Sequence, residues 1–168
     1  MSFEYSNLIP ADFHANSKVW IYQSTRLFSI SEAFEIEEKL TNYLANWKTH
    51  GTPVKGYANL FFGQFIVIMA DESVAHVGGC STDTLFRMVQ DLELNYKVSL
   101  LNRQSLAFLI KDKVQMLPMS QIKHGIENGF LNPDTLYFNN LAATKNELLN
   151  NWIIPMKDSW LNTHFKTT

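Results

Sequence analysis

The sequence has a single cysteine, five prolines and seven glycines among its 168 residues. One cysteine cannot form an internal disulfide, so the sequence predicts a fold that needs no such bond. The longest apolar run, Phe65 to Ala70, is far shorter than the roughly 20 residues that cross a bilayer, which predicts that a membrane is not a partner. No basic stretch precedes an apolar one near the N-terminus, so we expect a cytoplasmic protein without a signal peptide.

The sequence also lacks a marked excess of charge of one sign. Fourteen Lys and Arg residues face sixteen Asp and Glu residues, and the basic ones are scattered from Lys18 to Lys166. A nucleic-acid-binding protein usually carries a basic stripe that neutralises phosphates. The sequence therefore predicts no nucleic-acid partner.

Apolar and aromatic residues are plentiful. They make up 46% and 13% of the chain, which is typical of a globular protein rather than of a disordered one. A length of 168 residues favours a single domain. We expect a core over residues 18–117 and a C-terminal extension over residues 118–168.

The hydrophobic pattern of residues 18–117 predicts alternating strands and helices. The expected strands are 18–23, 54–62, 64–70, 106–110 and 114–117, and the expected helices are 29–50 and 82–96. Ser29 and Glu32 form a capping-box pattern, Gly51 offers a helix stop, and Gly63 offers a turn. Residues 1–17 show no sustained period, so we expect an irregular lead-in, and residues 111–113 should join a hairpin although the usual glycine is missing. The first six elements are ordered β-α-β-β-α-β, so we expect an α+β fold with an antiparallel sheet, of the ferredoxin-like sandwich type.

After Pro118 the pattern changes character. We expect a short helix at 119–128, an edge strand at 135–138 and a helix that begins at the Thr144–Glu147 capping box. Pro155 should break or kink that last helix, and Trp160 belongs to a final amphipathic turn. This helical extension is too apolar for a solvated tail, so we expect it to pack on the core.

Residues 71–84 hold the densest group of chemically useful side chains. Cys80 precedes a predicted helix N-terminus, where the helix dipole favours a thiolate. His50 or His76 would serve as a base and Asp83 would orient it, which gives a nucleophile set. The alternative is that Cys80 is a small buried residue filling a strand–helix corner.

Gly78, Gly79 and Ser81 in the same stretch suggest a cradle for an anion, because amide groups at a helix start are free to donate. The alternative is that the two glycines only turn the chain. A phosphate loop of the pattern G-x-x-x-x-G-K-[ST] is absent from the sequence.

A metal site would need Asp71, Glu72, His76, Cys80 or Asp83 to converge. His76 and Cys80 have a spacing that zinc sites tolerate, but no second cluster of the C-x-x-C or H-x-x-H kind follows. We therefore expect neither a metal nor a cofactor.

Five stretches together resemble a small bacterial protein family whose members often carry the label "ABC transporter ATPase". They are Val19-Trp20-Ile21-Tyr22-Gln23-Ser24, Trp47 with His50-Gly51, Gly79-Cys80-Ser81-Thr82-Asp83, Asn139-Asn140-Leu141, and Trp152 with Pro155 and Lys157-Asp158-Ser159-Trp160. The family usually has Ile or a similar residue where this chain has Thr82. The resemblance implies a single cytoplasmic domain and implies no particular activity. The label itself is not supported, because the Walker and signature motifs of such ATPases are absent.

Without a complete catalytic motif, the sequence favours a non-enzymatic binding or interaction domain, with a second copy of the chain or another protein as partner. Two alternatives stay open. One is a thiol-dependent enzyme or redox-responsive protein that uses Cys80. The other is a binder of anions or phosphorylated metabolites at residues Gly78 to Ser81.

Overall fold

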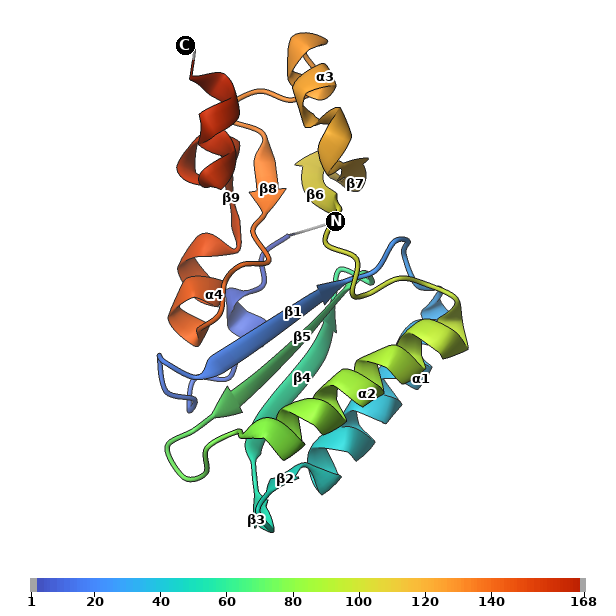
Figure 1. Cartoon of the computed structure of the whole chain (residues 1–168), viewed down its shortest axis with the longest axis vertical. Helices are drawn as coiled ribbons and strands as arrows, with labels where there is room; N and C mark the ends of the chain where they lie inside the picture. Colours follow the sequence, from blue (N-terminus) through green and yellow to red (C-terminus); the bar gives the residue numbers. More distant parts are fainter. Residues whose placement is uncertain (1–2, 167–168) are drawn as a thin grey trace. The chain divides into compact units, whose positions relative to one another are not determined.

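The computed structural model describes residues 3–166, so the first two residues of the expected irregular lead-in (1–17) lie outside it. The chain forms two compact units (Figure 1). The larger unit takes in residues 3–101 and 142–149, and the smaller unit takes in residues 102–141 and 150–166. Helices and antiparallel strands make up both units, which confirms the α+β class.

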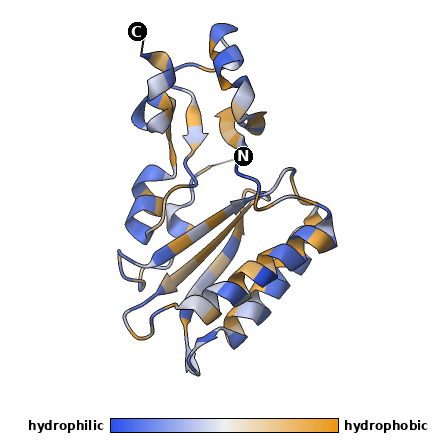
Figure 2. Cartoon of the chain, viewed as in Figure 1, coloured by the Kyte–Doolittle hydropathy of each residue, from blue (hydrophilic) through white to orange (hydrophobic). Residues whose placement is uncertain are grey.

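The larger unit is built on a three-stranded antiparallel sheet. Its strands are β1 (Lys18–Gln23), β4 (Lys55–Phe61) and β5 (Phe65–Asp71), in the order β1-β5-β4. The central strand, β5, is buried along all seven of its residues, and Figure 2 shows the apolar colouring of this sheet. A strand buried on both faces reads as a continuous apolar run, and that is the pattern the sequence shows here.

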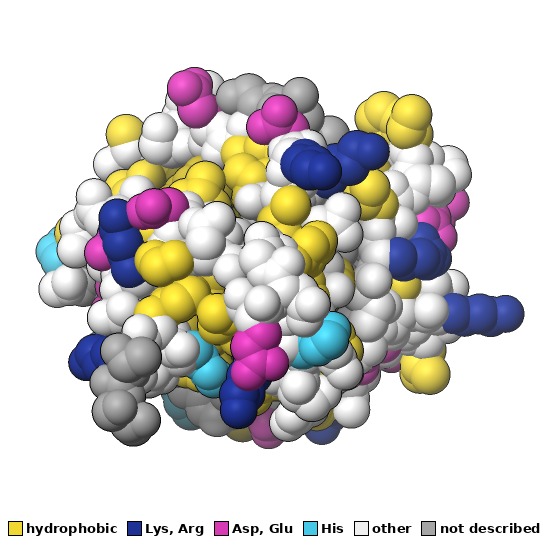
Figure 3. All heavy atoms as spheres, turned by 90° about the horizontal axis from the view of Figure 1, so that it is seen from above, with side chains coloured by type: hydrophobic (Ala, Val, Ile, Leu, Met, Phe, Trp, Pro, Cys, Tyr) yellow, Lys and Arg dark blue, Asp and Glu magenta, His cyan; other side chains and the backbone are white. Residues whose placement is uncertain are grey.

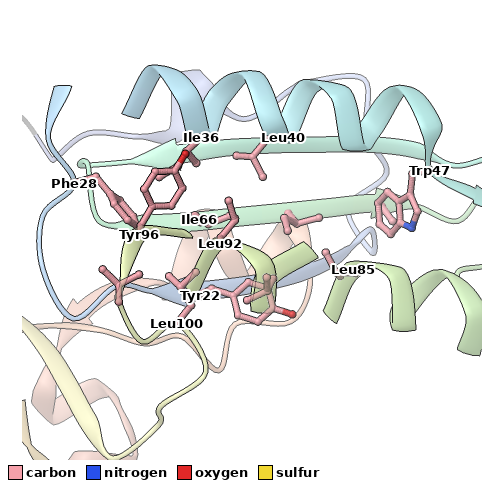
Figure 4. Packing of buried hydrophobic residues seen from close by; sticks show 14 of the residues in the cluster. Tyr22, Phe28, Ile36, Leu40, Trp47, Ile66, Leu85, Leu92, Tyr96 and Leu100 are labelled. Atoms are coloured by element: carbon pink, nitrogen blue, oxygen red, sulfur yellow. The ribbon is translucent and has the colours of Figure 1, made fainter. Parts of the chain in front are cut away.

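Two helices cover one face of this sheet. They are α1 (Ile30–Asn46), which begins with the predicted Ser29–Glu32 capping box, and α2 (Gly79–Tyr96). Ile36 and Leu40 of α1, Leu85 and Leu92 of α2, and Ile66 of β5 belong to one buried apolar cluster (Figure 4). The helical spacing of these apolar residues is what allows each helix to bury one stripe.

The opposite face of the sheet is covered by the N-terminal segment and by residues 142–149. The segment contains one 3-10 turn, η1 (Ser6–Leu8). The Phe13 ring lies edge-on to Tyr57 of β4 at 6.4 Å, and the Tyr57 hydroxyl donates to the Leu8 carbonyl. Leu148 is fully buried. Both faces of β5 are thereby shielded from water.

A short hairpin follows α1. Strands β2 (Lys48–Thr49) and β3 (Thr52–Pro53) flank a turn in which His50 and Gly51 both have positive φ, 49° and 80°. The predicted helix end at 50–53 was therefore wrong, since α1 ends at Asn46. Gly51 does use its conformational freedom, but in a hairpin turn rather than in a helix cap.

The smaller unit holds a four-stranded antiparallel sheet in the order β7-β6-β8-β9. The strands are β6 (Ser105–Ile110), β7 (Lys113–Pro118), β8 (Leu136–Phe138) and β9 (Ile153–Pro155). Short helical segments complete it: η2 (Met119–Gln121), α3 (Ile122–Glu127), η3 (Met156–Asp158) and η4 (Trp160–Phe165). Phe108, Ile122, Tyr137 and Leu161 form the centre of its own apolar core.

The ferredoxin-like expectation does not hold beyond the third strand. In that fold the strand after the second helix pairs with the first strand, but β6 pairs here with β7 and β8. The start of the outer edge of β1 pairs with another segment, because Val19 N–H donates to the Ala143 carbonyl and Lys145 N–H donates to the Ser17 carbonyl. The β6–β7 hairpin belongs to the smaller unit together with the C-terminal segment.

Three local expectations for the C-terminal segment change as well. Strand β8 lies between β6 and β9, so it is not an edge strand. Helix α4 (Lys145–Asn151) ends before Ile153, and Pro155 stands at the end of β9 instead of breaking a helix.

The 111–113 hairpin forms as predicted, with positive φ at Lys111 and Asp112 taking the place of a glycine. In the described part of the chain, no helix has both the length and the hydrophobicity needed to cross a bilayer.

Gly56 on β4 tests the contact between the sheet and the end of α1. A Cβ at this position would lie 2.9 Å from the Trp47 ring and 2.9 Å from Leu44 Cδ2. We expect Gly56→Ala to lower the free energy of unfolding by about 1–3 kcal/mol through overpacking, measured by urea titration. Gly79→Ala is the matched control, because nothing lies within 4 Å of a Cβ there. Equal effects of the two substitutions would contradict this packing.

Candidate functional site

The predicted nucleophile set at the start of α2 is only partly assembled. Cys80 is the second residue of α2 and its side chain is exposed, so the alternative of a buried corner-filling cysteine is wrong. Asp83 and His50 are exposed as well. Exposure makes the thiol accessible to reagents. A nucleophile would also need a neighbouring base that deprotonates the thiol.

Neither histidine supplies that base through a hydrogen bond. The His76 side chain is 90% exposed, and its Nδ1 lies 3.5 Å from Glu72 Oε1. His50 stands in the β2–β3 turn, with its Nε2 4.0 Å from where a Cβ on Gly78 would lie. Within residues 3–166, no imidazole is hydrogen-bonded to the Cys80 thiol. A nucleophile–base pair is therefore not formed in this structure.

Residues 78–82 have structural tasks at the helix start. Gly78 is the N-cap of α2, three to four residues earlier than the sequence suggested, and it gives no side-chain cap. The Ser81 hydroxyl donates to the Gly78 carbonyl at 2.9 Å, and the Ser81 carbonyl accepts from Trp47 Nε1 at 3.1 Å. Since Ser81 is only 1% exposed, its hydroxyl does not face solvent as an anion ligand would.

The acidic end of the same stretch belongs to a cavity that the sequence did not indicate. The cavity has a volume of about 240 Å³ and is lined by His14, Asn16, Ser17, Asp71, Glu72 and Ser73. We call it the Asp71 cavity. Its wall combines the end of β5 with the N-terminal segment just before β1, and all six residues belong to the larger unit.

Asp71 fixes one wall of the cavity. Its Oδ1 accepts from the Ser73 amide at 3.0 Å and from the Ser73 hydroxyl, and its Oδ2 accepts from the His14 amide at 3.0 Å. Lys55 Nζ lies 3.5 Å from Oδ2. The Ser73 hydroxyl and these two amides hold the pKa of the Asp71 carboxyl well below its usual range, and they outweigh the effect of burial.

Glu72 forms the neighbouring wall. Its Oε1 accepts from the Val77 amide at 2.8 Å and lies 3.2 Å from Lys18 Nζ. Burial opposes ionisation, but the Val77 amide and the Lys18 ammonium together hold the pKa of Glu72 below its usual value. Both cavity carboxylates are therefore ionised at neutral pH.

Ser17 is the unusual member of the cavity wall. It is 2% exposed, and its Oγ has no hydrogen-bond partner among residues 3–166. The backbone of the same residue is satisfied, since Ser17 N–H donates to the His14 carbonyl and its own carbonyl accepts from the Lys145 amide. A buried hydroxyl is nearly always hydrogen-bonded in native proteins, so an unpaired one calls for an explanation.

The sequence drew attention to only one of the two segments that line this cavity. Asp71 stands at the end of the most apolar strand, which marked it as notable, whereas residues 14–17 belong to a stretch without periodicity. The hydrogen bond between His14 and Asp71 joins residues 57 positions apart. Spacing along the chain cannot reveal such a contact.

A second cavity, of about 270 Å³, is lined by Lys39 of α1 and by Met88, Asp91, Leu92, Leu94 and Asn95 of α2. No buried polar atom that lacks a partner was found on its wall in the described chain. Nor do the described residues contain a group of three His, Cys, Asp or Glu side chains arranged to hold a metal ion. The Asp71 cavity is thus the better candidate site.

The charges beside the site are mixed in sign, since Lys18 lies next to Glu72 and Lys55 next to Asp71. Figure 3 shows Lys and Arg side chains at several separate places on one face of the molecule, with Asp and Glu side chains beside some of them. No family model, curated protein or solved structure matches the chain. The family resemblance noted in the sequence accordingly stays a prediction, and the site is judged by its own geometry.

The exposure of Cys80 leads to a kinetic prediction. We expect iodoacetamide to alkylate the thiol in the folded protein, and His50→Ala or His76→Ala to change the rate by less than about twofold, because neither ring is bonded to the sulfur. Mass spectrometry of quenched samples measures the rate. Protection until unfolding, or a large fall in one histidine variant, would contradict the described geometry.

The carboxylate of Asp71 leads to a pH prediction. Asp71→Asn replaces a carboxylate, whose two oxygens accept hydrogen bonds, with an amide whose NH2 group cannot accept them. We therefore expect the free energy of unfolding at pH 7 to fall by about 2–3 kcal/mol. The folded-state pKa of Asp71 is below the unfolded value. Its stabilisation is therefore complete above about pH 4 and is lost as the pH falls further, which shrinks the difference between wild type and variant. Urea titrations from pH 7 to pH 2.5 measure it.

The control for this titration is Asp91→Asn, because Asp91 lies exposed on α2. A deficit of Asp71→Asn that stays constant down to pH 2.5 would show that the charge of Asp71 is not what stabilises the fold.

Proposed function

We propose that the protein is a non-enzymatic binding domain whose ligand occupies the Asp71 cavity. The observation that carries the proposal is the cavity itself, whose wall gathers Asp71 and Glu72 and includes Ser17, a residue with a buried hydroxyl that lacks a partner among the described residues. Leaving such a hydroxyl unpaired costs about 1–3 kcal/mol, and a ligand whose binding opens the wall to this hydroxyl would recover that free energy. A polar group retained at a cost to stability is typical of a functional site.

The chemistry of the cavity favours binding over catalysis. Asp71 accepts hydrogen bonds on both of its oxygens, so it is not free to act as a general base. His14 Nδ1 accepts from the Asn16 amide at 3.0 Å, which engages that ring nitrogen in a local turn. Two of the candidate bases in the wall, Asp71 and His14, are thus engaged in hydrogen bonds within the protein.

Two alternatives from the sequence keep a specific observation in their favour. A thiol-dependent or redox-responsive role is favoured by the exposure of Cys80. An anion-binding role at residues 78–81 is favoured by the lack of a side-chain cap at Gly78. The alkylation measurement described above tests the first. A two-dimensional NMR titration with inorganic phosphate, followed at the amides of residues 79–81, tests the second.

Association with a protein partner is a further candidate, and we consider a second copy of the chain as that partner. Ile30 and Phe34 lie one turn apart on α1, with 79% and 69% of their surfaces exposed. Exposed apolar side chains at this spacing are a common feature of contact surfaces. Light scattering at high protein concentration tests it: a dimer mass that falls to the monomer mass in Phe34→Lys supports self-association, and a strict monomer contradicts it.

Substitution of Ser17 tests the proposed site. We expect Ser17→Ala to leave the free energy of unfolding unchanged or to raise it by about 1 kcal/mol, because the hydroxyl has no protein partner to lose. The same substitution should abolish binding of small polar fragments, detected by saturation-transfer NMR on a mixed library. Ser31→Ala, at an exposed position on α1, is the control.

Two results would contradict this proposal. One is a clear loss of stability in Ser17→Ala, which would show that the hydroxyl serves the fold. The other is an identical set of bound fragments in wild type and Ser17→Ala, which would place binding elsewhere.

A further inference from the structure

We infer that the outer edge of β4 binds an extended segment of another protein, which adds to the three-stranded sheet as a further strand and carries apolar residues together with Lys or Arg. This inference is independent of the Asp71 cavity. It follows from three features of the larger unit: the unpaired backbone of β4, the stripe of α1 that lies beside it, and the charge of that stripe.

Strand β4 forms an outer edge of the sheet (Figure 1). Ser24 N–H donates to the Gln64 carbonyl, and this bond fixes the alternation along β5, in which one set of residues bonds to β1 and the other set to β4. The residues of β4 whose backbone groups point away from β5 are therefore Gly56, Ala58 and Leu60.

These outward backbone groups are available for pairing. Leu60 N–H donates to Asn59 Oδ1 at 2.9 Å, a local contact with its own neighbour in the strand. The amides of Gly56 and Ala58 have no hydrogen-bond partner among residues 3–166. An extended segment would satisfy both of them, and it would meet the outward carbonyls of the same residues.

The other outer strands of the three- and four-stranded sheets are protected, whereas β4 is not. Strand β1 pairs at its start with residues 143–145, β7 ends at Pro118, and β9 has three residues and ends at Pro155. Strand β4 has seven residues, no proline and one charged side chain, Lys55, whose Nζ lies 3.5 Å from Asp71 Oδ2. Proteins usually cover, shorten or charge a long edge, so an unprotected one indicates a place for strand addition.

Helix α1 runs beside β4 in the opposite direction. Phe28 N–H, just before the helix, donates to the Gly63 carbonyl at 2.9 Å, which joins the start of α1 to the end of β4. Near the other end of the helix, Leu44 Cδ2 lies 2.9 Å from where a Cβ on Gly56 would stand. The helix therefore accompanies the strand along its whole length.

One flank of α1 faces this edge, and we call it the α1 stripe. Its members follow one another at steps of four and three residues: Ile30, Phe34, Glu37, Thr41 and Leu44. Residues at this spacing lie on one side of a helix, so the contact of Leu44 with Gly56 places the stripe along the β4 edge. Ile30 and Phe34 are exposed. An added strand would cover them with its own apolar side chains.

The charge of the α1 stripe defines the partner further. Glu37 stands in the middle of the stripe and Glu38 follows it, and both are exposed. Neither has an ion-pair partner in the described part of the chain. Lys39 lies on the other side of α1, where it lines a cavity with Met88 of α2. A Lys or Arg in the added segment is therefore attracted, and an acidic segment is repelled.

A second copy of the chain is a poorer occupant than a single segment. Pairing of β4 with its copy about a twofold axis would put both α1 helices on the same face of the joined sheet. Neighbouring strands lie about 4.8 Å apart, whereas packed helices need about 8–10 Å between their axes. The same symmetry would bring the two Glu37 side chains towards each other. A segment that brings no helix avoids both conflicts.

Peptide binding to the full chain tests the inference. The probe is the fluorescein-labelled peptide acetyl-Arg-Val-Lys-Val-Thr-Val-Lys-Leu-amide, and fluorescence anisotropy measures its affinity. One twin peptide has Glu in place of Arg and Lys, and another carries an N-methyl group on every backbone amide. We expect saturable binding of the basic peptide, with NMR shifts at the amides of Gly56, Ala58 and Leu60. Both twins should bind at least about tenfold more weakly.

Two substitutions in the protein locate the binding. Ala58→Pro removes an outward amide, and proline is tolerated there because this N–H serves no bond to β5. Glu37→Lys reverses the charge of the α1 stripe. We expect each substitution to weaken the binding of the basic peptide about tenfold, while urea titration shows that both variants remain folded.

Each substitution has a matched control that should leave peptide binding unchanged. Val114→Pro is the control for proline: Met119 N–H donates to the Gln104 carbonyl, so alternation along β7 leaves the Val114 amide pointing away from β6. Asp91→Lys, at an exposed position on α2, is the control for the reversed charge.

Five results would overturn the inference. They are no saturable binding of the basic peptide up to about 1 mM, equal binding of the acidic twin, equal binding of the N-methylated twin, equal binding to wild type, Ala58→Pro and Glu37→Lys, and a dimer mass in light scattering that falls to the monomer mass in Ala58→Pro. The last result would assign the edge to a second copy. All five leave the proposal for the Asp71 cavity standing, because neither substitution alters a residue of its wall.

Discussion

The burial of β5 on both faces is the constraint on which the larger unit depends. The six apolar residues of this strand, Phe65 to Ala70, have no exposed surface, so the neighbouring elements must supply apolar cover on both faces. Helices α1 and α2 cover one face, and the N-terminal segment with residues 142–149 covers the other. The strand ends in an aspartate, which must be satisfied where it stands. The donors that gather around Asp71 follow from that requirement.

The Asp71 cavity is a by-product of the same constraint. The His14 amide donates a hydrogen bond to Asp71, and this contact holds residues 14–17 at the end of the strand. Most of the polar groups at this place are hydrogen-bonded or ion-paired within the protein. Ser17 Oγ is the exception, and it distinguishes this cavity from a tightly folded loop. The exposed Cys80, by contrast, has the accessibility of a reactive group without the partners that would activate it.

Local patterns in the sequence predicted the local structure well. The limits of β1, the capping box of α1, the turn at Gly63 and the hairpin around residue 112 all depend on neighbouring residues, and the structure confirms them. The pairing of β6 was not predictable in this way, because one of its partners, β8, lies far along the chain. The candidate site divided similarly. Asp71 stood out at the end of an apolar strand, whereas Ser17 had no periodic signal and gains its importance from a contact distant in sequence.

The larger unit is discontinuous in sequence, and this has a consequence for its synthesis. Residues 3–101 contain the three-stranded sheet and both long helices. The start of β1 and the Ser17 carbonyl, however, form hydrogen bonds with residues 143–145. A ribosome delivers the entire β6–β8 segment before that closing piece emerges. The larger unit therefore completes its fold only after residues 142–149 have been synthesised, and until then the start of β1 presents an open strand edge to the cell.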